Sequence, residues 1–155
     1  MRKRSKYRPK GVRLDVVNYV VNGLKPIAAH DAATVLRIKN HAALTALTQG
    51  KATREDINTL IEAFNTTEAL VCVSEDLGGD WREEIRQAQD ALYAVATRGV
   101  AHDDKFLLNG LEMKALNIAM ELHDAQMDKA TVIQLEKATA IVNQRIRNNQ
   151  TRRIG

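Results

Sequence analysis

Two histidines with acidic neighbours form the most metal-like pattern in the chain. His41 and His123 lie in separate segments of helical periodicity, and Glu121, Asp124 and Asp128 are close to His123 in the sequence. Imidazole and carboxylate groups from two helices can bind a divalent cation. The spacing is not that of His-Glu-x-x-His, and histidines of this kind are more often packed in a core or an interface. We therefore predict no metal site and no cofactor.

Nucleophilic catalysis has little support in the sequence. A nucleophile needs a Ser or Cys beside a base, and the candidates are Ser5, Ser74 and Cys72. Cys72 lies in an apolar helical pattern, so we expect it to be buried, in a protein from a reducing compartment. Gly78-Gly79 lacks a phosphate-binding motif and predicts a turn between helices. The chain is predicted not to be an enzyme, with a metal-dependent hydrolase as an open alternative.

Basic residues gathered at the two ends of the chain are the strongest functional signal. Residues 2 to 13 contain seven cations and no acid: Arg2, Lys3, Arg4, Lys6, Arg8, Lys10 and Arg13. Residues 145 to 153 contain four more: Arg145, Arg147, Arg152 and Arg153. Twelve of the 23 basic residues then remain against 19 acidic ones, so the body is about seven charges negative although the chain is +4. An acidic body with cationic ends is typical of proteins that bind phosphate polymers.

The chemistry of the N-terminal segment fits DNA or RNA. Lys and Arg neutralise phosphates and release counterions, and Tyr7 can stack on a base. No recognition helix with base-reading side chains is identifiable, so sequence-specific reading is not expected. The same cations could instead clasp the acidic body of a neighbouring copy.

A second possibility is a pocket for a phosphate-bearing ligand between helices or subunits. Its candidate residues are Arg37, His41, Arg98 and His123. Such a pocket would fit a protein that sequesters a nucleotide signal.

Composition predicts an all-α bundle of four to five principal helices. The 155 residues are 45% apolar but only 4% aromatic, which favours an Ala- and Leu-rich helical core. We expect a basic extended arm over residues 1–13, one helical domain over 14–149 and a basic tail over 150–155. No apolar run is long enough for a membrane span, and no signal peptide is evident, so a cytoplasmic protein is expected.

Capping signals divide the domain. Asp31 and Gly50 bound the first long helix, with Val35, Ile38, Ala42 and Ala46 as its inward stripe. A second helix starts at a capping box, Thr53 to Asp56, and stops at Gly78-Gly79.

The remaining helices follow similar signals. A third runs from Asp80 to Gly99, and a loop follows to Asn109, which caps the fourth. Its expected inward stripe consists of Met113, Leu116, Met120, His123 and Met127. A fifth begins near Thr131, and its fusion with the fourth is left open.

Three segments resemble a family of small uncharacterised proteins of tailed bacteriophages and prophages. They are Lys6 to Lys10, Lys39 to Thr53 and Leu122 to Asp128. The resemblance covers nearly the whole chain and implies a phage accessory protein made in the bacterial cytoplasm, with a role in replication, host takeover or inhibition of host defence. It transfers no catalytic residue.

The helical faces also predict self-association. Ala-rich faces bury little area each, so a homo-oligomer is expected. The leading hypothesis is therefore a non-enzymatic, homo-oligomeric binding protein whose basic ends contact DNA or RNA.

Overall fold

Five long helices build the part of the chain that the structure describes. The computed structural model describes residues 23–29 and 31–152. The helices are α2 (Asp31–Thr48), α3 (Arg54–Val73), α4 (Arg82–Ala101), α5 (Gly110–Lys129) and α6 (Val132–Arg147). Three short 3-10 helices accompany them: η1 (Ile27–Ala29), η2 (Glu75–Leu77) and η3 (Gly79–Trp81). The predicted all-α bundle is confirmed, whereas the predicted arm over residues 1–13 lies outside the described residues.

Three of the helices begin at a reciprocal capping box. The Asp56 amide donates to Thr53 Oγ1 at 3.3 Å, and the Thr53 amide donates to Asp56 Oδ2 at 2.8 Å. Asn109 and Thr131 make the same exchange with the third residue of α5 and of α6. Each box satisfies backbone N–H groups that have no partner inside the helix. The starts predicted at Thr53, Asn109 and Thr131 are confirmed.

The predicted glycine stops hold for one helix of three. Gly50 lies two residues after the end of α2, but the stop predicted at Gly78-Gly79 is wrong, because the chain becomes extended at Ser74 and α3 ends at Val73. Gly50 and Gly78 have φ values of +67° and +107°, in the left-handed region that glycine adopts most easily. The predicted stop at Gly99 is wrong, because α4 continues to Ala101. Gly99 instead allows Phe106 to pack on the helix, since a Cβ at that position would lie 2.1 Å from Phe106 Cδ1.

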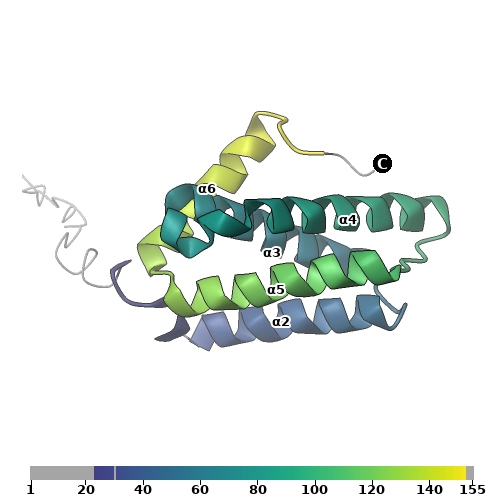
Figure 1. Ribbon diagram of the computed structural model, residues 1–155, viewed down its shortest axis with the longest axis horizontal. Helices are drawn as coiled ribbons and strands as arrows, with labels where there is room; N and C mark the ends of the chain where they lie inside the picture. Colours follow the sequence, from purple (N-terminus) through teal and green to yellow (C-terminus); the bar gives the residue numbers. More distant parts are fainter. Residues whose placement is uncertain (1–22, 30, 153–155) are drawn as a thin grey trace, which may run out of the picture.

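The central helix of the bundle is α3, which packs against α2, α4, α5 and α6. Figure 1 shows α2, α4 and α5 running along the long axis of the molecule, while α6 crosses obliquely at one end. The main core lies among α2 to α5 and includes the loop residue Phe106. A second apolar cluster joins η1, α3, α5 and α6 at the end where α6 begins.

The buried side of α2 differs from the predicted one. Val35 and Ile38 are 66% and 64% exposed, so the prediction that they point inward is wrong. The buried residues are Asn40, Ala43, Leu44 and Leu47. Hydrophobic periodicity could not place Asn40 inside, because its burial depends on a hydrogen bond to His123 on another helix.

Two further burial predictions are corrected. Cys72 is exposed, because it lies on the solvent side of α3, whereas its neighbours Leu70 and Val71 face the core. Met113 is 37% exposed in the first turn of α5, whereas Leu116, Met120, His123 and Met127 are buried as predicted. The apolar stripe of α5 therefore starts one turn later than the sequence pattern indicates.

A bridge from the start of the described chain fixes the break between α5 and α6. The Ile27 amide donates to Ala130 O at 2.9 Å, and the Val132 amide donates to Lys25 O at 3.1 Å. Ala130 itself is extended, with φ −66° and ψ 148°. The backbone groups released by the break thus find partners about one hundred residues earlier in the chain, which settles that the two helices are separate.

Within the described residues, no helix has both the length and the apolar character required to cross a membrane.

Candidate functional site

Two of the C-terminal cations fold back on acidic side chains of the body. Arg145, in the last turn of α6, places Nη1 2.7 Å from Glu68 Oε2 on α3. Arg152 places Nη1 2.6 Å from Asp90 Oδ1 on α4, and its guanidinium lies 4.9 Å from the centre of the Tyr93 ring. These pairs partly neutralise the positive charge at the C-terminal end, because Arg145 and Arg152 each face a carboxylate.

The other predicted basic residues differ in their surroundings. Arg147 is exposed and makes no ion pair with any residue that the structure describes. Arg153 lies outside the described residues, as do all the N-terminal candidates: Arg2, Lys3, Arg4, Lys6, Tyr7, Arg8, Lys10 and Arg13.

The predicted ligand residues Arg37 and His41 meet α5 on the surface. Arg37 Nη2 lies 2.6 Å from Asp128 Oδ1, and Arg37 Nε lies 3.4 Å from Asp124 Oδ1. His41 Nε2 lies 2.7 Å from Asp124 Oδ2. The hydrogen bond to Asp128 and its charge raise the pKa of Arg37. Arg37 and His41 therefore each have a carboxylate partner, and a phosphate would have to displace it.

His123 is placed beneath this surface and is only 2% exposed. Its Nδ1 lies 2.9 Å from Thr67 Oγ1, and its Nε2 lies 3.1 Å from Asn40 Nδ2. Burial lowers the pKa of His123 to about 4, so the imidazole is neutral near pH 7. Both ring nitrogens are engaged, which leaves this histidine no free position for a metal or a substrate. Among the described residues, no group of three or more metal-binding side chains gathers.

Arg98 does not join Arg37, His41 and His123. It lies on α4 and makes two hydrogen bonds to Glu112 of α5, at 2.7 and 2.8 Å. The Arg98 hydrogen bond lowers the pKa of Glu112. Arg98 lines a shallow pocket of about 490 Å³ together with residues of the α4–α5 loop. The four predicted ligand residues thus occupy two separate regions, and three of them meet at the junction of α2 and α5.

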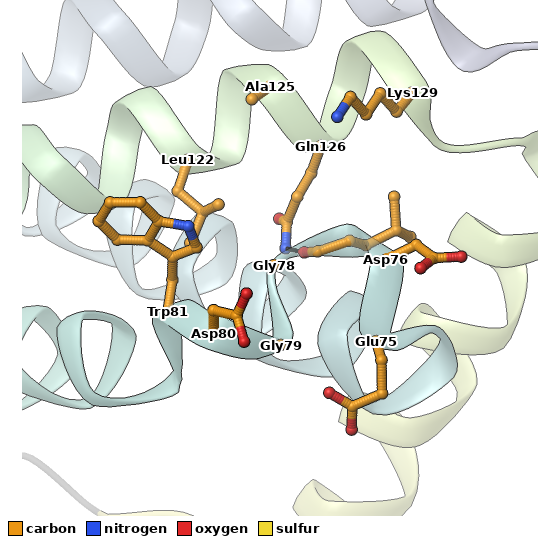
Figure 2. A pocket seen from close by; sticks show the side chains of 11 residues that line it. Glu75, Asp76, Gly78, Gly79, Asp80, Trp81, Leu122, Ala125, Gln126 and Lys129 are labelled. Carbon is orange, nitrogen blue, oxygen red and sulfur yellow. Dashed lines mark hydrogen bonds between the residues drawn. The ribbon is translucent and has the colours of Figure 1, made fainter.

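A pocket that the sequence did not predict lies between the α3–α4 connection and α5. It has a volume of about 340 Å³, and its lining includes Trp81, Leu122 and Gln126. Figure 2 shows Trp81 beside Leu122, with Gln126 reaching from α5 toward Gly78. No sequence signal could have found Gln126, because its role depends on how α5 packs over the turn at Gly78-Gly79.

No protein-family model, curated protein or solved structure matches the chain. The resemblance to small phage proteins therefore stays a prediction.

Proposed function

We propose that this protein is a non-enzymatic helical binding protein whose basic N-terminal segment contacts DNA or RNA. The observation that carries the proposal is the segregation of charge, with seven cations and no acid between residues 2 and 13. Phosphate contacts of this kind give affinity without sequence preference, because each neutralised phosphate releases counterions.

The pairing of the C-terminal cations supports a division of roles between the two ends. Arg145 and Arg152 are engaged with Glu68 and Asp90, so binding a phosphate would cost these cations their present partners. We therefore assign the main phosphate contacts to the N-terminal segment, with Arg147 as an added contact from α6.

Nucleic-acid binding is tested with labelled single- and double-stranded DNA and RNA across a salt series. The wild-type chain is compared with a variant in which all seven cations of residues 2–13 are replaced by Gln. We expect the wild type to show a steep fall of affinity with salt and the variant to lose most of that slope, because the slope is about 0.9 per phosphate contact. Arg145→Gln with Arg152→Gln is the matched control and should change the slope little. Equal salt slopes of affinity for the wild type and the seven-Gln variant would contradict the proposal.

A nucleotide-binding role is the second candidate, and the geometry favours it less. It needs side chains that are free to bind phosphate, yet Arg37 and His41 already face Asp124 and Asp128. His123 is buried and neutral, so it contributes no positive charge.

Self-association forms part of the proposal, and the exposed side of α2 supports it. Val35 and Ile38 lie one turn apart on this helix, and Leu36 adds a further partly exposed apolar side chain. A second copy of the chain that covers this side would remove apolar area from water. We propose a homo-oligomer that uses this surface.

A further inference from the structure

The unpredicted pocket combines an aromatic ring, a carboxylate and a buried amide. Trp81 is 49% exposed, at the end of η3, and its ring stands beside Leu122 of α5. The Asp80 carboxylate lies between Trp81 and Gly79, while Glu75 and Asp76 point away from the ring (Figure 2). Gln126 closes the inner side and is only 2% exposed.

The amide of Gln126 has a fixed orientation and one unused acceptor. Its Nε2 donates to Thr67 O at 3.0 Å and to Leu77 O at 2.7 Å. Because both partners are carbonyl oxygens, the amide cannot be turned around without losing both bonds. Its Oε1 is buried and accepts no hydrogen bond from the described residues. A buried acceptor without a donor costs about 1–3 kcal/mol, so this oxygen marks a place where an N–H or O–H donor is missing.

The chemistry around this oxygen selects a cation that carries N–H groups. The face of an indole ring attracts a guanidinium or ammonium group, and a nearby carboxylate adds charge. Asp76 and Asp80 make no ion pair with any described residue, whereas Glu75 is paired with Arg82. Lys129 is the opposing cation at the pocket, so the carboxylates outnumber it.

We propose that this pocket binds a basic side chain of the protein's own N-terminal segment, residues 2–13. An Arg side chain fits best, because the planar guanidinium can stack on Trp81 while its N–H groups pair with the Asp80 carboxylate.

The position at which the described chain begins supports this occupant. Lys25 and Ile27 are bonded to Val132 and Ala130, directly after Lys129 in the pocket lining. Ile27 also shares an apolar cluster with Leu77, another lining residue. The nine residues 14–22 separate the basic segment from Gly23. Nine residues span at most about 30 Å, which is enough to bring a cation of residues 2–13 to a pocket next to this junction.

Occupation of the pocket does not depend on the proposed function, because it requires no nucleic acid. It would nevertheless place the acidic pocket in competition with phosphate for the same cations. The body would then hold the N-terminal segment until a polyanion of higher charge density displaces it.

Trp81 provides the test, because it is the single tryptophan of the chain. We would measure acrylamide quenching of its fluorescence in the full chain without nucleic acid. The variant with all seven cations of residues 2–13 replaced by Gln should be quenched about twofold more strongly, since an Arg stacked on the ring shields it. Asp80→Asn should give a similar increase, and the two changes combined should give no further increase, because they remove one shared contact.

Two controls keep the result specific. Glu55→Gln removes an exposed carboxylate at the opposite end of α3, so it should leave the quenching unchanged. A synthetic peptide of residues 2–13, added to the seven-Gln variant, should restore the shielding and saturate. The proposal is overturned if the seven-Gln variant is quenched like the wild type, or if the peptide restores nothing. A shielding of the wild type that weakens on dilution would overturn the assignment to the protein's own segment in favour of a neighbouring copy.

Discussion

Thr67 accepts a hydrogen bond from Nδ1 of the buried His123, across 2.9 Å between α3 and α5. The direction is fixed because the single hydroxyl proton of Thr67 is donated to Ala63 O, 3.0 Å away. His123 Nε2 therefore accepts from Asn40 Nδ2 on α2. One neutral imidazole thus links three helices, and a proton on Nε2 would face an N–H donor.

This arrangement predicts that the protein loses stability in mild acid. The pKa of His123 is about 4 in the folded chain, against 6.5 for an ordinary histidine. Between these values the unfolded chain binds a proton that the folded chain does not, so stability falls as the pH falls. The loss is about 1.4 kcal/mol per pH unit and about 3 kcal/mol in total, complete below the folded pKa. Urea unfolding at about pH 7, 5.5 and 4.5 would measure it.

The histidine itself can be checked by substitution. His123→Gln should flatten the fall of stability between these pH values, whatever its effect near pH 7, because the titrating group is gone. An unchanged slope in the His123 variant would assign the acid sensitivity to other groups.

Replacing either of two glycines near the α4–α5 loop by alanine should change the stability of the protein, with opposite signs at the two positions. Gly99→Ala should destabilise the protein by about 1–3 kcal/mol, because the new Cβ would meet the buried Phe106 ring at 2.1 Å. Gly110→Ala should stabilise it by about 0.5–1 kcal/mol, because the first position of α5 has no atom within 4 Å of that Cβ and Ala favours the helix. Thermal unfolding of both variants compares the signs, and two changes of the same sign would contradict the packing at Gly99.

Of two ion pairs that involve α4, Arg98–Glu112 should contribute more to the free energy of unfolding than Arg86–Glu83. Glu112 is 8% exposed, and besides Arg98 it accepts from the Asn109 amide at 2.9 Å. Glu112→Gln should therefore cost about 1–2 kcal/mol near pH 7, a figure reduced because Arg98 is half exposed. Glu83→Gln breaks an exposed pair with Arg86 at 3.8 Å and should cost less than about 0.5 kcal/mol. Urea unfolding measures both, and an equal cost would show that burial of Glu112 adds nothing.

The exposed side of α2 predicts how self-association can be broken. Ile38→Glu should shift the mass in solution toward the monomer, because a charge in an apolar interface is unfavourable. Leu111→Glu, at the most exposed large apolar residue of α5, is the matched control and should keep the wild-type mass. Light scattering after size exclusion gives the mass, and a monomeric wild type would refute the proposed oligomer.

The sequence alone limited the bundle to four or five long helices and located most of their starts. Thr53, Asn109 and Thr131 cap their helices because a capping box needs only residues three positions apart. The buried rows of α3 and α4 could also be predicted, since their apolar residues recur every three or four positions. The concentration of positive charge at the ends is likewise a property of the sequence.

Tertiary structure decided what depends on partners distant in the chain. Asn40 turns inward because His123 lies opposite, and this rotates Val35 and Ile38 outward against their hydropathy. α5 ends at Lys129 because residues 25–27 bind the backbone of the break. The pocket at Trp81 exists because α5 places Gln126 against the turn at Gly78. The Gln126 amide donates to two carbonyl oxygens, and its own oxygen accepts no hydrogen bond from the described residues. Local patterns cannot encode these relationships, because each of them joins residues from different helices.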